Sequence, residues 1–189
     1  MLPPGLITSA HAVSYWLLPG REDQAALDQL SALACQAVGA CTLPPHITLY
    51  SEPLDGEHDT SQKQVVDRLQ QLADCRKPVQ LWPSTIEATR IYTQSLVLRF
   101  NASARTELLP WFSQLRQRSA SEFGYRLDPH LSLLYCKDTL ERRKELAQRL
   151  PLPEGPLLFE RISAVTHPLT ISGPADIAAF ITIHTCSLA

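Results

Sequence analysis

Two short stretches of the chain carry the same arrangement of side chains that can do acid–base chemistry. The first is Pro45-His46-Ile47-Thr48-Leu49, and the second is Pro129-His130-Leu131-Ser132-Leu133. Each consists of a proline, a histidine, an aliphatic residue, a hydroxyl residue and another aliphatic residue. Histidine moves protons near neutral pH, and a hydroxyl donates hydrogen bonds. Each copy therefore offers a general acid or base beside a group that can bind a phosphate oxygen.

Each copy is predicted to form a β-strand that is entered through the fixed bend of its proline. Side chains of a strand alternate between its faces, so His46 and Thr48 share one face, roughly 6 to 7 Å apart. His130 and Ser132 have the same relation. If both strands line one cleft, the two histidines can act from opposite sides of one phosphorus while the hydroxyls bind its free oxygens. Such a site needs neither a metal nor a cofactor.

These paired motifs resemble those of the two-histidine (2H) phosphoesterases, a superfamily that includes bacterial 2′-5′ RNA ligase-like proteins and cyclic phosphodiesterases. Tyr15-Trp16-Leu17-Leu18-Pro19 and His130-Leu131-Ser132-Leu133-Leu134-Tyr135 resemble the cyclic phosphodiesterase branch. The resemblance runs from about Ser14 to Leu150. It implies two lobes related by a pseudo-two-fold axis, with the active site between them and the two motif histidines as the catalytic pair.

Three aromatic residues are further candidates for substrate binding. Trp16 occupies the position of the family's early aromatic residue, and an aromatic wall suits a nucleobase; a core tryptophan is the competing interpretation. Strict alternation places Tyr135 on the core face, whereas the resemblance implies a tyrosine in the substrate pocket. A strand that ends or bulges after Leu133 would reconcile the two. Alternation places Tyr50 on the same face as the first motif histidine.

The remaining sequence predicts an α+β fold in which strand, helix, motif strand, helix and strand occur in each half. Predicted helices span about residues 23–38, 60–73, 104–119 and 138–150. Predicted strands outside the motifs span about residues 12–18, 79–82, 85–89, 92–100, 157–167 and 177–185, and residues 51–61 are predicted as a loop. We expect a single domain over residues 1–189, made of two intertwined lobes. Each lobe is an antiparallel sheet covered by helices.

Composition narrows the classes of partner. With 189 residues, 44% of them hydrophobic and 19% charged, the chain resembles an ordinary globular protein. The formal net charge of −2 argues against a broad nucleic-acid surface, which is usually basic. No stretch is long and apolar enough to span a membrane. The five cysteines form no CxxC pair, and the first ten residues lack the features of a signal peptide, so we expect a cytoplasmic monomer.

The sequence predicts no metal site. No set of histidines, cysteines or carboxylates has the spacing of structural zinc ligands. Four histidines have no partner motif and are interpreted as ordinary structural or surface residues: His11, His58, His167 and His184.

The expected function is metal-independent hydrolysis of a cyclic phosphate on ribose. The resemblance implies a small nucleotide as substrate, either a nucleoside 2′,3′-cyclic phosphate or ADP-ribose 1″,2″-cyclic phosphate. An RNA-end enzyme resembling 2′-5′ RNA ligase is the first alternative, and a basic rim would favour it. A nucleotide-binding module without turnover is the second alternative.

Overall fold

The computed structural model describes residues 10–40, 42–54, 62–119 and 124–189. Its strands are β1 (His11–Pro19), β2 (Ile47–Pro53), β3 (Val79–Leu81), β4 (Pro83–Ala88), β5 (Leu96–Phe100), β6 (His130–Leu134), β7 (Leu157–Pro168) and β8 (Ile181–Ser187). Its helices are α1 (Arg21–Val38), α2 (Gln62–Asp74), the 3-10 turn η1 (Tyr92–Gln94), α3 (Ser103–Gln117), α4 (Leu140–Arg149) and α5 (Pro174–Ala178). The predicted α+β class is confirmed.

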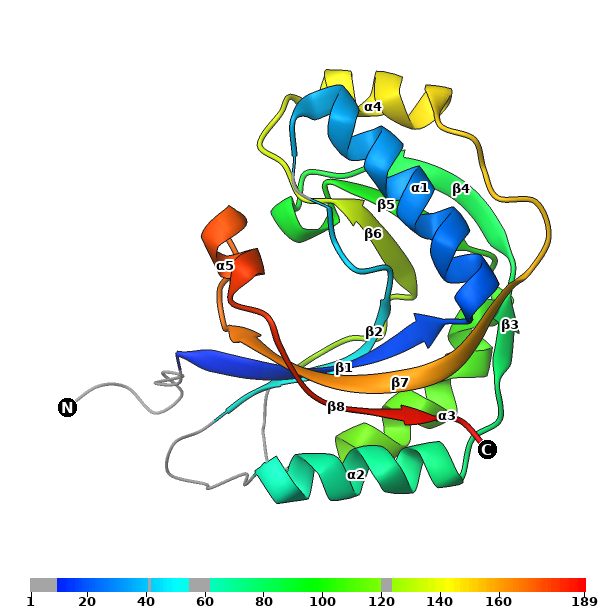
Figure 1. Cartoon of the computed structure of the whole chain (residues 1–189), viewed down its shortest axis with the longest axis vertical. Coiled ribbons are helices and arrows are strands. Elements are labelled where there is room, and N and C mark those ends of the chain that lie inside the picture. Colours follow the sequence, from blue (N-terminus) through cyan, green and yellow to red (C-terminus); the bar gives the residue numbers. More distant parts are fainter. Residues whose placement is uncertain (1–9, 41, 55–61, 120–123) are drawn as a thin grey trace.

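All strand pairings within the described part of the chain are antiparallel. The strand order is β3-β7-β1-β2-β6-β5-β4, and β8 pairs with β7. The two motif strands, β2 and β6, are neighbours, yet only the pair Ile47 and Leu131 joins them. The sheet therefore has two halves, one around β1 and β7 and one around β5, which meet at the motif strands (Figure 1).

Two helices each pack on a motif strand that belongs to a different part of the sequence. The first helix of the chain, α1, packs on β6, whereas α3 packs on β2. The helix α2 covers β7 and β8, and α4 covers β4. Figure 1 shows α1 and α4 on the outer side of the upper half and α2 and α3 beneath the lower half. Leu27 and Ala34 of α1 are completely buried, so the burial of apolar surface stabilises this crossed arrangement.

Each motif strand has a β-bulge just after its hydroxyl residue. Along β2, Tyr15 of β1 pairs with Tyr50, while the next residue, Trp16, pairs with Thr48. Leu49 is therefore an extra residue without a partner on β1. Because a bulge adds one residue, the alternation of side chains reverses beyond it.

The same irregularity occurs in β6. Leu96 of β5 pairs with Leu134, whereas the next residue, Val97, pairs with Ser132. Leu133 is the extra residue here. A bulge is therefore present at Leu133 itself, one residue earlier than the predicted position after it, and β2 contains a matching bulge.

Two predicted strands begin later than expected. Residues 92–94 form η1 instead of strand, because the Ser95 hydroxyl donates to the Tyr92 carbonyl over 2.6 Å and closes a tight turn. Residue 177 lies in α5, where the Asp176 carboxylate accepts from the Gly173 N–H over 3.1 Å at the helix start. The strand β8 then begins at Ile181.

The predicted loop over residues 51–61 is partly wrong. The strand β2 continues to Pro53, because β1 pairs with it as far as Ala12. Residues 55–61 lie outside the described residues. None of the described helices combines the length and the apolar composition needed to cross a bilayer.

Candidate active site

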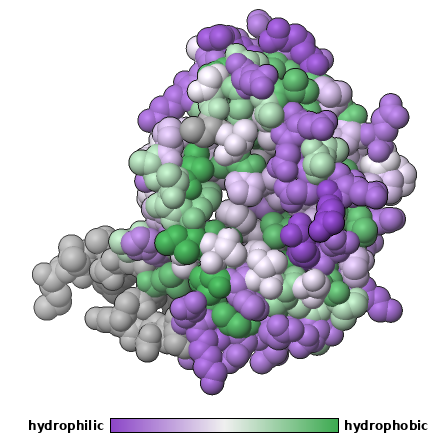
Figure 2. Space-filling model, in the orientation of Figure 1, coloured by the Kyte–Doolittle hydropathy of each residue, from purple (hydrophilic) through white to green (hydrophobic). Residues whose placement is uncertain are grey.

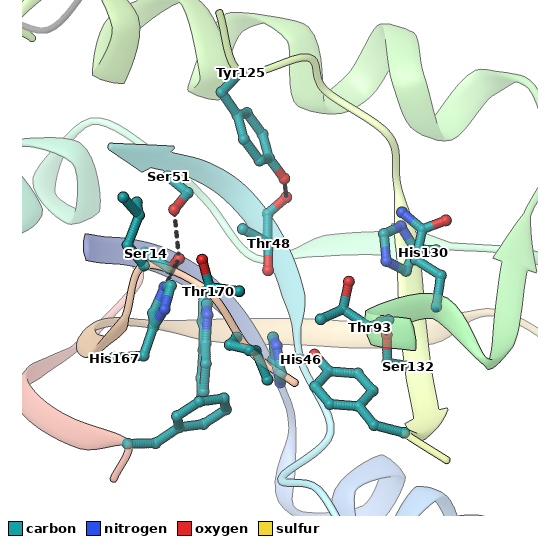
Figure 3. A pocket seen from close by; sticks show the side chains of 16 residues that line it. Ser14, His46, Thr48, Ser51, Thr93, Tyr125, His130, Ser132, His167 and Thr170 are labelled. Atoms are coloured by element: carbon teal, nitrogen blue, oxygen red, sulfur yellow. Dashed lines mark hydrogen bonds between the residues drawn. The ribbon is translucent and has the colours of Figure 1, made fainter. Parts of the chain in front are cut away.

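A cavity of about 450 Å³ opens where the two motif strands meet. It brings together His46, Thr48, His130 and Ser132, which sequence reasoning had paired (Figure 3). The described lining residues include no lysine, arginine, aspartate or glutamate. The complete lining is Ser14, Trp16, His46, Thr48, Ser51, Thr93, Gln94, Tyr125, His130, Ser132, Tyr135, His167, Leu169, Thr170, Ile171 and Phe180.

The two motif histidines have the same backbone anchor. Nδ1 of His46 lies 2.6 Å from the carbonyl oxygen of Pro44, and Nδ1 of His130 lies 2.7 Å from that of Asp128. In each case the acceptor is two residues upstream, across the intervening proline. A carbonyl only accepts, so Nδ1 carries the proton in the neutral ring and Nε2 has a free lone pair. Each ring can therefore exchange a proton at Nε2.

His46 lies in a dry, aromatic environment. Its ring stacks on the indole of Trp16, with centroids 3.6 Å apart and 13° between the planes, and the side chain is 5% exposed. Burial lowers the pKa of His46 to about 4, with smaller contributions from the neighbouring His130 and His167 imidazoles. The hydrogen bond to the Pro44 carbonyl opposes this shift only in part. His46 is neutral near pH 7 and is therefore ready to accept a proton.

His130 instead has a carboxylate neighbour. Oδ2 of Asp128 lies 3.3 Å from its Nδ1, Arg99 Nη1 donates to Asp128 Oδ1 over 2.8 Å, and Gln94 Nε2 donates to Oδ2 over 3.3 Å. These bonds, that to His130 foremost, hold the pKa of Asp128 well below its usual range. The charge of an imidazolium at His130 therefore has a permanent counter-charge. Sequence reasoning missed Asp128, although it stands two residues before the histidine.

The two motif hydroxyls both line the cavity. Thr48 is half-buried, and its backbone carbonyl accepts from the Tyr125 hydroxyl over 3.2 Å (Figure 3). Ser132 is buried, and its hydroxyl donates to the Thr93 carbonyl over 2.9 Å. The Ser132 hydroxyl must therefore leave this bond before it can donate to a ligand.

Tyr135 lines the cavity, as the resemblance implied. The bulge at Leu133 explains its position, because it places the third residue after Ser132 on the cavity face. Burial raises the pKa of Tyr135 to about 12, which the hydrogen bond with Ser132 opposes. The ring is thus a neutral phenol that can donate.

The expectation for Tyr50 is wrong. Its ring is completely buried and makes edge contacts with Phe112 and Tyr125, with centroids 5.9 and 5.8 Å apart. The bulge at Leu49 is the physical reason, because it turns Tyr50 into the core and brings Ser51 to the cavity instead.

Trp16 lines the cavity, but its indole is not an open wall. One partner is the His46 ring, and Phe180 meets the indole edge-on, with centroids 5.7 Å apart. The side chain is 5% exposed. These contacts allow the indole to hold the His46 ring in place, but they leave little of its face open for stacking on a nucleobase.

Sequence reasoning also missed a polar group at the other end of the cavity. Ser14 Oγ lies 2.7 Å from Nε2 of His167 and 2.9 Å from Ser51 Oγ (Figure 3). The position of Ser14, two residues before Trp16 in a strand, was a usable signal for the shared face. No local pattern marks His167, because the pairing of β7 with β1 brings it here.

Among residues 10–40, 42–54, 62–119 and 124–189, no cluster of three or more histidines, cysteines and carboxylates could hold a metal ion. The arrangement can carry out proton transfer at two imidazoles and hydrogen bonding to anionic oxygens.

No protein-family model and no curated protein matches the sequence. Several solved structures share the fold. Protein TT0787 of Thermus thermophilus is 17% identical, with a TM-score of 0.63 over 94% of this chain and 97% of that one. E. coli LigT complexed with NADP+ is 13% identical, with a TM-score of 0.59 over 94% and 98%.

Kluyveromyces marxianus Usb1 is 15% identical, with a TM-score of 0.51 over 93% of this chain and 98% of that one. These similarities extend over nearly the whole of each chain, and they include both halves of the sheet. The chain therefore has the two-lobed fold of the two-histidine phosphoesterases.

Proposed function

We propose that the protein hydrolyses a cyclic phosphate on ribose without a metal, with His46 and His130 as the catalytic pair. The observation that carries this proposal is the matched anchoring of the two rings: both bind a carbonyl through Nδ1, and both line one cavity. Two Nε2 atoms on either side of one phosphate suit an in-line displacement.

In the proposed reaction, a water oxygen attacks phosphorus while Nε2 of His46 takes the proton of the water. The bond between phosphorus and one ribose oxygen breaks, and Nε2 of His130 gives its proton to that oxygen. The product is a nucleoside phosphomonoester, and proton exchange with solvent resets both rings. The neutral, buried His46 suits the base, and the Asp128 carboxylate beside His130 suits an acid that begins as imidazolium.

The hydroxyls of Thr48 and Ser132 are proposed to donate to the non-bridging oxygens, where negative charge grows in the transition state. Tyr135 is proposed to bind the ribose or the base, because it lines the cavity and carries both an aromatic ring and a hydroxyl. Trp16 is proposed to hold the ring of His46 in place.

A small nucleotide is the substrate class that we propose. The described lining residues provide no fixed cation, and the chain has a net charge of −2, so little attraction is available for a long polyanion. Structures of E. coli LigT with 3′-AMP and with NADP+ are consistent with small ligands on this fold.

An RNA-end enzyme remains the alternative within the same fold, and a module that binds without turnover is the alternative outside catalysis. One experiment separates all three. The protein is incubated in EDTA with adenosine 2′,3′-cyclic phosphate, or with an RNA oligomer ending in the same cyclic phosphate, and products are separated by chromatography.

We expect hydrolysis of the mononucleotide in EDTA, with a kcat/KM at least as high as that for the oligomer. The matched control is the His46→Ala, His130→Ala double variant, which should yield no product. A strong preference for the oligomer would favour the RNA-end enzyme. Binding without product, or activity that only zinc or manganese restores, would overturn the proposal.

A further inference from the structure

The end of the cavity beyond Thr48 contains a buried hydrogen-bonded chain that the proposed reaction does not use. It runs from His167 on β7 through Ser14 on β1 to Ser51 on β2. His167 is 8% and Ser14 is 4% exposed, whereas Ser51 is half-buried and lines the cavity. All three residues line the cavity, and Ser51 is the most exposed of them, so its hydroxyl is the best placed to meet a ligand.

The direction of the hydrogen bonds can be traced along this chain. Nδ1 of His167 lies 2.8 Å from the Pro168 carbonyl, which only accepts. The Ser14 hydroxyl donates its single proton to Ser51. In this arrangement Nε2 of His167 donates to Ser14, so the arrangement requires both ring nitrogens to carry protons; with a neutral ring, Nε2 accepts from Ser14 and Ser51 donates to Ser14 instead. Only the charged form of the ring therefore leaves the proton of Ser51 free to point into the cavity.

The charged form of this chain requires an anion close to Ser51. Burial is the main cause that lowers the pKa of His167, and the nearby His11 lowers it further. His46, the other imidazole that interacts with His167 electrostatically, also opposes a second positive charge. The described lining residues supply neither a carboxylate nor another fixed charge. A ligand that brings negative charge to Ser51 would stabilise the imidazolium.

The position of Ser51 separates it from the phosphate between the motif histidines. Ser51 follows Thr48 by three residues, as Tyr135 follows Ser132, and a bulge lies between the members of each pair. Three residues of bulged strand span roughly 8 to 10 Å, which is more than one phosphate group can bridge. A group that binds Ser51 is therefore a second group on the substrate.

We propose that Ser51, supported by Ser14 and His167, forms a second anion-binding subsite that takes a second phosphoryl group of the substrate, such as the 5′-phosphate of a nucleoside 2′,3′-cyclic phosphate. This inference rests on the proposed function, because it adds a substrate feature to the same cavity. Ser51 contacts the ligand, while Ser14 and His167 are positioning residues.

The kinetic test compares adenosine 2′,3′-cyclic phosphate with and without a 5′-phosphate. We expect the 5′-phosphate to raise kcat/KM about tenfold, mainly by lowering KM, which corresponds to one charge-assisted hydrogen bond. Ser51→Ala and His167→Gln should bring the ratio for the two substrates close to one. Ser163→Ala is the matched control, because this buried serine of β7 bonds to Thr185 outside the cavity and should preserve the ratio.

A binding test does not depend on turnover. Calorimetry with adenosine 3′-phosphate and with adenosine 3′,5′-bisphosphate, in buffers of different ionisation enthalpy, measures affinity and proton uptake together. The bisphosphate should bind about tenfold more tightly and take up extra protons, and His167→Gln should abolish the extra uptake.

The two tests fail separately. If the wild-type protein hydrolyses neither cyclic substrate, the proposed function fails, and the calorimetry still decides the subsite. Equal affinity of the wild-type protein for the monophosphate and the bisphosphate would overturn the subsite, as would a substrate ratio unchanged by Ser51→Ala.

Discussion

The two catalytic candidates differ in their surroundings, although their backbone anchors match. His46 is stacked on Trp16, and burial lowers its pKa to about 4. His130 has the Asp128 carboxylate at 3.3 Å, which Arg99 holds in place. Because their surroundings differ, one of the two imidazoles can be neutral while the other is charged at the same pH. This difference is the basis for naming His46 the base and His130 the acid.

The first prediction concerns the joint action of these rings. His46→Ala and His130→Ala should each lower kcat for a cyclic nucleotide by about 10²- to 10⁴-fold, because each removes one proton transfer. The double variant should be little slower than the worse single variant, because groups that act as a unit are not additive. Rapid-quench or steady-state assays measure this. Either single variant with near wild-type turnover would contradict the pairing.

The second prediction concerns Trp16. Replacing it with leucine admits water beside His46, so the pKa of His46 should rise from about 4 toward 6.5. The base works only when neutral, and activity is lost as the pH falls through its pKa. The acidic limb of the kcat/KM profile should therefore move to higher pH. Trp82→Leu, at an exposed position, is the control and should leave the limb in place. An unmoved limb in Trp16→Leu would refute the base assignment.

Among the strands, the alternation of side chains was enough to predict that the histidine and the hydroxyl residue of each motif lie on the same face. It was correct for His46 and Thr48, and it failed for Tyr50 because Leu49 is an extra residue in β2. A bulge depends on the register with the neighbouring strand, which a local sequence pattern does not contain. Strict alternation would have failed for Tyr135 too, and only the family resemblance predicted that this tyrosine lies in the pocket.

The polar chain at the far end of the cavity was beyond sequence reasoning for a related reason. Ser14 and His167 belong to β1 and β7, which lie at opposite ends of the sequence and pair side by side. Three positions of one network thus come from three strands. The strand topology brings these three residues together, whereas the residues of each histidine motif are contiguous in the sequence.

The third prediction concerns the wall formed by η1, which carries Thr93 and Gln94 into the cavity. The buried Arg143 of α4 holds the segments next to η1 in place by donating hydrogen bonds to several backbone carbonyls. Those acceptors belong to Thr89, Ser95, Asp138 and Thr139. Arg143→Met removes the guanidinium donor from all four carbonyls, of which only those of Ser95 and Thr139 are known to keep a backbone N–H donor, and should lower the free energy of unfolding by about 2 to 4 kcal/mol.

Arg142→Met is the matched control for this change. The Arg142 side chain is 64% exposed and forms a surface ion pair with Asp138, so its loss should cost less than about 1 kcal/mol. Urea unfolding measures both variants. Equal effects in Arg143→Met and Arg142→Met would contradict the anchoring role of Arg143.

At the scale of the whole molecule, the buried imidazoles link stability to pH. The pKa of His46 is about 4 in the folded state and about 6.5 in the unfolded chain, so between these values the unfolded chain binds the extra proton. The free energy of unfolding therefore falls as the pH drops through this window. The contribution of His46 between pH 7 and 4.5 should be about 2 to 3 kcal/mol. Burial of His167 acts in the same direction.

Chemical unfolding at pH 7 and at pH 4.5 tests this link. The His46→Gln variant lacks the titrating ring, and it should lose about 2 to 3 kcal/mol less than the wild-type protein over the same pH change. An identical loss in both proteins would show that folding does not lower the pKa of His46.

The surface residues differ in hydropathy between the ends and the middle of the molecule. Figure 2 shows strongly hydrophilic residues over α4 at the top and over α2 at the bottom, with paler and apolar residues between them on the side of α5.

The pairing of β1 with β7 has a consequence for synthesis on the ribosome. Ser14 and His167 are 153 residues apart, so at about 5 to 20 residues per second the partner emerges roughly 8 to 30 s after the first strand. Throughout that interval β1 has one unpaired edge and the apolar side chains of Val13, Tyr15 and Leu17, all completely buried in the finished protein. A nascent chain with both motif histidines would still lack the strand that completes the cavity, and its exposed edge would be a binding site for chaperones.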